Sequence, residues 1–462
     1  MEFSTNKKLI IILMLWLMLL AGYNTNPQKL DFSNFLNLFH GIRAFFPILA
    51  GFLALILLLK KRFFSRKIFK TPLGLLILYT LIGIFSSVFL SAKPLTALYW
   101  AISYFSVLLV LLLSLVDSKS SLSPLISLNW IVIFIITIGL FVLFLLQPGA
   151  IQFLVNGNFL GGRPYESLAN VPAEKEILGM AGTRPTGLGR YAGVVALVAL
   201  ARLLSEKRKL KLNWFLFFLL SYFVLIFSQA KTAILGFILG SFLIFFLKSE
   251  SKFAIFRWSL FTILQSALVG ILLFYIPLFY VPHLERIAAS GPKIVVLEPS
   301  VLTPEPGIVT LEPSVQTPEP SLTEKITPIS TLSGRTTGVW SQAWKLFFKS
   351  PLIGWGFHAD RIFLGGQHAH NAILHALVQT GLMGTIPFIL AFIWVWFILF
   401  KLLRIPSLTE KPFLIEIAGV LTFFMIRSIT ESTGAFFGTD WLLLAPLLAF
   451  IQNLNQKYLS NL

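Results

Sequence analysis

The sequence predicts an all-α protein, a polytopic bundle of about 12 transmembrane helices with one large extracytoplasmic loop. Hydrophobic residues make up 56% of the 462-residue chain and charged residues only 12%, whereas charged residues make up about 25% of an average soluble domain. Apolar runs of about 20 residues recur along the chain, and each is long enough to cross about 30 Å of hydrocarbon as a helix. One or two such runs would indicate an anchor, but about twelve indicate an embedded bundle.

The expected spans follow the apolar runs in order. The first run comes after Lys7 and Lys8 and has no small-residue cleavage site behind it, so we interpret it as a retained span and not as a signal peptide. The expected spans cover residues 8–23, 42–59, 72–90, 95–116, 128–146, 187–204, 212–228, 231–247, 258–281, 380–400, 413–431 and 438–452.

Positive charge is concentrated in alternate connections between these spans. With the N-terminus inside, the cytoplasmic loops and tails hold about 21 of the 37 Lys and Arg residues, with dense clusters at Lys60–Lys70 and Arg202–Lys211. Cytoplasmic loops of membrane proteins carry such an excess of basic residues. We therefore expect a multi-pass protein of the inner (cytoplasmic) membrane with both termini in the cytoplasm. The net charge of +18 then needs no nucleic acid as a partner.

Three regions follow from this topology. Residues 1–281 form an N-terminal transmembrane bundle of about nine spans, residues 282–379 form the extracytoplasmic loop, and residues 380–462 form the C-terminal transmembrane helices. Within the loop, residues 296–320 contain a proline-rich repeat with a period of 14. Proline at this frequency blocks helix and favours extended chain, so we interpret the repeat as a spacer.

An amphipathic helix is expected after the repeat. Its aromatic side chains recur at helical spacing, with lysines on the other side. The aromatic residues are Trp340, Trp344, Phe347 and Phe348, and the lysines are Lys345 and Lys349. Such a helix would rest on the membrane surface or over a cavity.

Basic residues lie beside the expected outer ends of several spans, where ionisable side chains are costly and mark candidate sites. Arg184 and Arg190 lie among four glycines in Gly182–Gly193. Glycine lets the backbone approach a ligand closely, and the guanidinium fork matches phosphate oxygens. The alternative is a pair of interfacial arginines that extend toward water.

Two further cations stand in short polar segments. Lys231 occupies a hairpin of a few residues between two apolar spans, on the expected outer side, where a lysine opposes the charge rule. Arg335 lies in Ser333–Trp340 of the large loop. Each is a candidate for binding an anion. The alternatives are an interfacial lysine and an ordinary turn residue.

Two of the six histidines lie within three residues, at His368 and His370. Imidazole accepts a proton near neutral pH. Asn371 either caps the helix that follows or forms a hydrogen bond with a sugar hydroxyl, and His375 is expected to pack or to support the residues that meet the ligand. A His-x-His pair can bind a metal, but no third ligand with suitable spacing stands nearby, so we expect neither a metal nor another cofactor.

Arg427 and Glu431 lie one helical turn apart at the outer end of the span over residues 413–431. They either pair with each other or line the same outer cavity. The candidate residues as a set are cationic and lack the paired acids of a glycosidase. The chain has no phosphate-binding loop for ATP and no cysteine nucleophile. The set suits an anionic, lipid-linked diphosphate.

Four local patterns resemble the O-antigen ligase and polymerase superfamily of membrane glycosyltransferases. They are Arg184–Gly187 (RPTG), Ser228–Lys231 (S-x-x-K), Ser333–Trp340 (SGR…W), and Pro351–Gly356 leading to His368–Gly384 (PLIGWG, then HAHN…GLMG). The resemblance covers residues 180–400, and the number of spans extends it to the whole chain.

The resemblance implies a fold like that of the GT-C glycosyltransferases and transfer of a glycan from undecaprenyl diphosphate to a hydroxyl acceptor, a lipid or a glycan, outside the cytoplasmic membrane. It implies that His370 removes the acceptor proton and that Arg184, Lys231 and Arg335 hold the diphosphate, without a metal. The expected catalytic residues are thus His370, Arg335 and Arg184. The expected residues for binding the diphosphate or glycan are Arg190, Lys231, His368, Asn371, Arg427 and Glu431.

Two other functions fit the same patterns. A polymerase on this scaffold would use another lipid-linked repeat as its acceptor. A transporter of an inorganic anion such as bicarbonate would need repeated halves and broken helices with polar residues at the midplane. No half-to-half repeat stands out, and the charges lie at the ends of the spans.

Overall fold

The computed structural model describes residues 35–60, 71–115, 123–146, 185–205, 208–228, 230–248, 335–405 and 408–458. Within these ranges the chain is helical and forms no strand. The expected spans over residues 8–23 and 258–281 lie outside the described residues, as does the proline-rich repeat.

Ten long helices lie over the other ten expected spans. They are α2 (Phe35–Lys60), α3 (Pro72–Phe89), α4 (Pro94–Leu115), α5 (Ser123–Leu146), α8 (Pro185–Ser205), α9 (Arg208–Phe227), α10 (Lys231–Lys248), α15 (Ala372–Leu403), α16 (Lys411–Ser428) and α17 (Thr439–Tyr458). Five of them, α3, α4, α8, α10 and α15, are long and apolar enough to cross a membrane. Over the described residues an all-helical membrane protein is therefore confirmed. The five helices found there are fewer than the twelve spans expected for the whole chain.

Local sequence signals set the helix boundaries. Thr71 precedes α3, and its hydroxyl accepts a hydrogen bond from the Gly74 N–H at 3.1 Å. Pro72 is the first residue of that helix. Proline lacks an N–H, and the first turn of a helix has no partner for one, so this position favours it.

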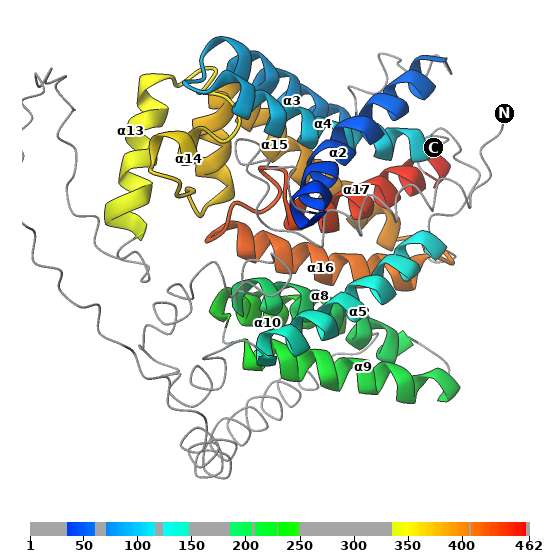
Figure 1. The fold of residues 1–462 in the computed structure, drawn as a ribbon. Coiled ribbons are helices and arrows are strands. Elements are labelled where there is room, and N and C mark those ends of the chain that lie inside the picture. The colour runs from blue at the N-terminus through cyan, green and yellow to red at the C-terminus, as the bar shows by residue number, and fades with distance from the viewer. Residues whose placement is uncertain are drawn as a thin grey trace, which may run out of the picture.

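Helix α16 lies between two groups of helices (Figure 1). Helices α5, α8, α9 and α10 lie on one side of it, and α2, α3, α4, α15 and α17 lie on the other. Short residues let α10 approach α16, because a side chain at Gly240 would come within 2.7 Å of the Gly419 carbonyl oxygen. Close backbone approach at small residues is a usual way to pack helices in lipid.

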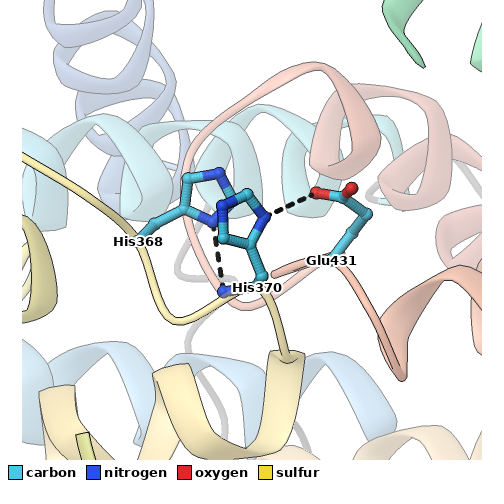
Figure 2. A group of neighbouring side chains, drawn as sticks. All are labelled: His368, His370 and Glu431. Atoms are coloured by element: carbon cyan, nitrogen blue, oxygen red, sulfur yellow. Dashed lines mark hydrogen bonds and ion pairs between the residues drawn. The ribbon is translucent and has the colours of Figure 1, made fainter. Parts of the chain in front are cut away.

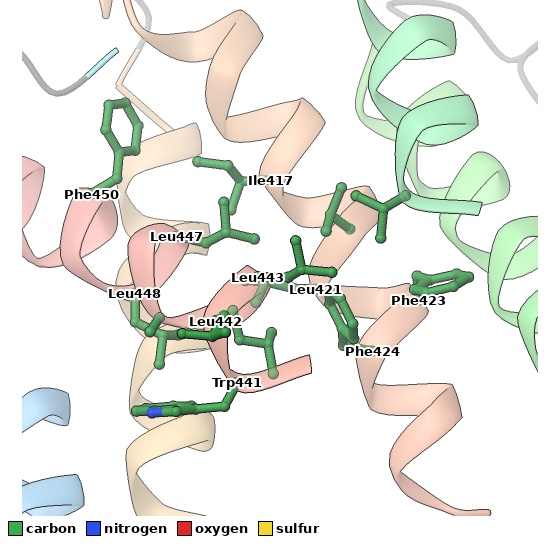
Figure 3. Packing of buried hydrophobic residues seen from close by; sticks show 14 of the residues in the cluster. Ile417, Leu421, Phe423, Phe424, Trp441, Leu442, Leu443, Leu447, Leu448 and Phe450 are labelled. Carbon is green, nitrogen blue, oxygen red and sulfur yellow. The ribbon is translucent and has the colours of Figure 1, made fainter. Parts of the chain in front are cut away.

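Leucine and aromatic side chains fill the contact between α16 and α17, as Figure 3 shows for Leu421, Phe424, Trp441 and Leu447. Trp441 is fully buried and stacks on Tyr104 of α4 with ring centroids 4.4 Å apart. The start of α17 is therefore fixed against two other helices, which matters because the polar groups described below stand there.

Basic residues gather at one end of the bundle. Arg202 in the last turn of α8 bonds to Glu416 of α16 at 2.8 Å. Lys248 at the end of α10 donates to Ser205 at 3.2 Å, and Lys457 near the end of α17 donates to a carboxylate oxygen of Glu410 at 3.3 Å. These contacts place the ends of α8, α10 and α17 beside the start of α16.

Helix α15 differs from its expected span. It begins at Ala372 and not at residue 380, and its backbone leaves the helical conformation at Gly381, where φ is +58°. The segment before α14 fills this break, because the Gly356 N–H donates to Gln379 at 2.8 Å and the Met383 N–H donates to Leu352 at 3.0 Å. The two glycine-bearing patterns PLIGWG and GLMG therefore form one unit.

Two short helices stand at the end of the bundle opposite the basic end. Helix α13 (Ser341–Lys349) follows a π-helical turn (Arg335–Trp340), and α14 (Ala359–Phe363) comes next. Helix α13 is amphipathic as expected, but its aromatic residues divide: Phe347 is buried, whereas Trp344 and Phe348 are 43% and 69% exposed.

Candidate functional site

The two neighbouring histidines form a tight turn just before α15. His370 has a φ of +49°, a left-handed conformation that is uncommon for a residue with a side chain. Its backbone N–H donates to Nδ1 of His368 at 3.2 Å, and the two ring centroids lie 3.6 Å apart. The turn thus brings two imidazoles into contact, with their planes tilted by 38°.

A carboxylate from another part of the chain completes this group. Glu431 follows the end of α16, and its Oε2 lies 3.5 Å from Nδ1 of His370 (Figure 2). Both side chains keep some contact with the surface, with exposed fractions of 26% for His370 and 19% for Glu431. A carboxylate beside Nδ1 favours a hydrogen on that nitrogen, which leaves Nε2 to accept a proton.

The surroundings set the charge of the other two groups. Burial raises the pKa of the Glu431 carboxyl, but the neighbouring His370 imidazole and the charge of Arg427 hold this pKa at about 2. Burial, followed by the charges of His370 and Arg361, lowers the pKa of His368 to about 3. At neutral pH, Glu431 is therefore ionised and His368 is neutral.

These three residues also correct the expectation that no third metal ligand stands near the histidines. Ligand atoms of His368, His370 and Glu431 lie within 4.8 Å of one another, close enough to meet at one ion. However, Nδ1 of His368 already accepts the His370 N–H. Ligation through Nε2 would move the ring hydrogen to Nδ1, against that N–H, so the hydrogen bonding disfavours a metal here.

Asn371 takes the capping role. Its Oδ1 accepts the Leu374 N–H at 2.9 Å, so it is the N-cap of α15. Its Nδ2 donates to the Ile429 carbonyl oxygen at 3.0 Å. Asn371 thus ties the histidine turn to the segment that carries Glu431, rather than pointing both polar atoms at a ligand.

The two buried arginines of the expected set meet at a carboxylate that the sequence did not single out. Nε of Arg190 lies 2.8 Å from Oδ1 of Asp440, and Nη2 of Arg427 lies 3.8 Å from Oδ2. Thr433 also donates to Oδ2, at 2.8 Å. Arg190 is therefore a buried, paired residue, and the alternative of an interfacial arginine that extends toward water is wrong for it.

Arg427 connects this ion cluster to the histidines. Its backbone carbonyl accepts the Glu431 N–H at 2.8 Å, so the arginine that faces Asp440 and the acid that faces His370 stand on successive turns. Arg427 and Glu431 were expected either to pair with each other or to line one cavity. In the structure each has its own partner, because Arg427 faces Asp440 while Glu431 faces His370.

The glycine-rich start of α8 packs on the hairpin that leads to Lys231. A side chain at Gly189 would come within 2.5 Å of the Ser228 hydroxyl. Lys231 is exposed and begins α10 beside this contact. Arg184 lies outside the described residues, and for Arg335 only the backbone is described, at the start of the π-helical turn.

Sequence comparison bears on this region of the chain. Residues 215–389 match a family model described as O-antigen ligase. The exopolysaccharide production protein ExoQ of Rhizobium meliloti is 30% identical over 118 residues, which cover 22% of this chain and 26% of that relative. The chain therefore matches about a quarter of the relative's length. The resemblance to the O-antigen ligase superfamily that the motifs predicted is confirmed.

Proposed function

From this resemblance and from the histidine turn, we propose that the protein is a membrane glycosyltransferase of the O-antigen ligase type. It transfers a glycan from undecaprenyl diphosphate to a hydroxyl group of a lipid or glycan acceptor. The observation that carries the proposal is the placement of His370, whose imidazole has an ionised carboxylate at Nδ1 and lies next to a buried cluster of arginines.

The proposed step is a single displacement. Nε2 of His370 takes the proton of the acceptor hydroxyl, and the acceptor oxygen forms a bond to the anomeric carbon of the donor. The bond between that carbon and the phosphate oxygen breaks, and the electron pair leaves with the lipid diphosphate. General base catalysis of this kind contributes typically about 10²–10⁴-fold.

Cations would offset the charge that grows on the leaving diphosphate. We assign this role to Arg184, Lys231 and Arg335, from the family resemblance. Arg190 and Arg427 face Asp440, and the charge of Arg427 also acts on the ionised Glu431. These two cations and two carboxylates balance one another, so the charge of the diphosphate is left to Arg184, Lys231 and Arg335.

The charge distribution supports an extracytoplasmic site. Arg202, Lys248 and Lys457 lie at the end of the bundle where α16 begins, and the histidine turn lies beyond the end where α16 finishes. Basic residues mark the cytoplasmic ends of membrane helices. We therefore assign the site to the outer face of the inner membrane, with both termini in the cytoplasm.

A polymerase is the second candidate function. The name of the matched relative refers to exopolysaccharide production, and a polymerase would use the same base and the same leaving group. The two functions differ only in the acceptor, which is a lipid core for a ligase and a second lipid-linked glycan for a polymerase.

An acceptor competition assay tests the proposal. Purified protein in proteoliposomes receives a labelled glycan on undecaprenyl diphosphate, together with a lipid core acceptor or an unlabelled lipid-linked glycan. Product on the lipid core supports the ligase, and lengthened lipid-linked glycan supports the polymerase. Because we propose that no metal takes part, EDTA should leave the rate unchanged, and loss of the reaction in EDTA would contradict that part of the mechanism.

A further inference from the structure

A buried aspartate, Asp360, accepts a hydrogen bond from the backbone of the histidine turn. Asp360 on α14 has no exposed surface, and its two carboxylate oxygens accept three hydrogen bonds. Oδ1 accepts the Arg361 N–H at 2.9 Å. Oδ2 accepts the Ala369 N–H at 2.8 Å and faces Nδ1 of His375 at 2.5 Å. Ala369 stands between His368 and His370, so Asp360 holds the middle of the turn.

The same aspartate is one end of a chain of side chains that reaches α3. His375 Nε2 pairs with the Gln379 side-chain nitrogen. The single hydrogen of the Tyr79 hydroxyl is shared between two acceptors, the Ala435 carbonyl oxygen at 2.6 Å and Gln379 Oε1 at 3.1 Å, and Ala435 lies in the connection that carries Glu431. The chain therefore links the two segments that supply the candidate site.

Donor and acceptor chemistry fixes the direction of this chain. An amide nitrogen only donates, so His375 Nε2 must accept from Gln379, and the ring hydrogen must sit on Nδ1 and point at Asp360. His375 is 1% exposed and engaged at both ring nitrogens, so it has no nitrogen left for an acceptor hydroxyl. Burial raises the pKa of the Asp360 carboxyl, but His375 outweighs it and holds this pKa well below its usual range.

We propose that Asp360 is a positioning residue, which fixes the turn through the Ala369 N–H and so aims the His370 imidazole at Glu431. The left-handed backbone at His370 is unfavourable for a residue with a side chain and persists only where surrounding bonds support it. One such bond lies directly before His370, where the Ala369 N–H donates to Oδ2 of Asp360. The kinetic part of this inference rests on the proposed function.

Two substitutions of Asp360 with side chains of similar shape distinguish the effect of its hydrogen bonds on the turn from the effect of its charge. Asp360→Leu keeps the branched outline but accepts no hydrogen bond. Asp360→Asn keeps one oxygen, which can face Ala369 and His375, and loses only the charge and the bond from Arg361. We expect the Leu variant to lower kcat on the order of 10²-fold, as a small misplacement of a reacting group does. The Asn variant should recover most of that loss, with the KM for the donor unchanged in both.

A second measurement does not depend on activity. The chain has six histidines, so a sample labelled with ¹³C at histidine gives a spectrum simple enough to follow the rings of the turn. Asp360→Leu should move the His368 and His370 signals, and Asp360→Asn should leave these two near their wild-type positions. Glu416→Gln removes another buried carboxylate at the basic end, and it should lower thermal stability without moving either signal.

Equal loss of kcat in the Asn and Leu variants would overturn the inference, because charge and not position would then matter. Unchanged His368 and His370 signals in a folded Leu variant would overturn it as well. If the Leu variant does not fold, the Asn variant decides, since signals displaced from the wild-type positions contradict the role of the oxygen. Absence of transfer in the wild type would reject the proposed function, while the spectra still decide the role of Asp360.

Discussion

Nδ1 of His370 lies 3.5 Å from Oε2 of Glu431, although His370 comes just before the start of α15 and Glu431 comes just after the end of α16. This relationship gives the histidine a partner that orients its ring, and it leaves Nε2 directed away from the carboxylate. Because Arg427 lies in the last turn of α16, the end of this helix supplies both the carboxylate that faces His370 and a nearby cation.

The Glu431 carboxyl should make stability depend on pH in acid. Its folded pKa of about 2 lies below the ordinary value of 4.5, so its contribution is complete above pH 4.5 and is lost as the pH falls toward 2. Thermal unfolding of the wild type across this window should show a decline that is smaller in Glu431→Gln. Parallel curves for the two proteins would mean that this carboxyl is not held in its ionised form.

Asp440 should be needed to keep two arginines inside the protein. Asp440→Asn leaves Arg190 and Arg427 without their shared carboxylate, and removal of one partner from a buried ion pair costs about 3–5 kcal/mol. Thermal unfolding should show the loss. Thr433→Val removes only the hydroxyl that donates to the same carboxylate, and it serves as the milder control. Equal stability of Asp440→Asn and wild type would contradict the ion cluster.

Arg335 should not tolerate lysine. Lysine keeps the charge but lacks the fork that binds two phosphate oxygens at once, so Arg335→Lys should reduce transfer from the lipid-linked donor. Kinetics with varied donor concentration measure the effect. Lys345→Arg, on the exposed side of α13, is the matched control and should behave as wild type. Full activity of Arg335→Lys would remove Arg335 from the diphosphate site.

Helix α13 should contact lipid through its exposed aromatic residues. Phe348 is 69% and Leu352 is 60% exposed, and the backbone of Leu352 bonds to Met383 on the exposed apolar side of α15. The chain has no cysteine, so single cysteines report cleanly. In proteoliposomes, a water-soluble maleimide should label Lys345→Cys quickly and Phe348→Cys slowly, with both labelled after denaturation. Equal rates before denaturation would show that this face of α13 meets water.

Sequence patterns located the helices better than the site. Apolar runs predicted ten of the long helices. For Asn371 the sequence left open whether it caps the next helix or binds a sugar, and the structure shows the cap. The break at Gly381 was not predicted, since it depends on the PLIGWG segment filling it. The pairing of His370 with Glu431 was not predicted either, because nothing local relates residues on different helices.

The two missed acids show the same limit. Asp440 stands in the first turn of α17, where acidic residues are common. Its role is recognised only in the structure, where Arg190 of α8 and Arg427 of α16 contact it. Asp360 lies in a polar stretch of the loop, where an acid attracts no notice. In both cases the signal is a buried carboxylate, fully buried at Asp360 and 7% exposed at Asp440, and a single sequence does not show burial.

The most direct test compares wild type with His370→Ala in proteoliposomes that contain the labelled donor and the acceptor, with Lys457→Ala at the opposite end as the control. The account predicts labelled product with wild type and Lys457→Ala, and a loss of about 10²–10⁴-fold with His370→Ala at equal insertion into the membrane. Product formed at the wild-type rate by His370→Ala would contradict the assignment of His370 as the base.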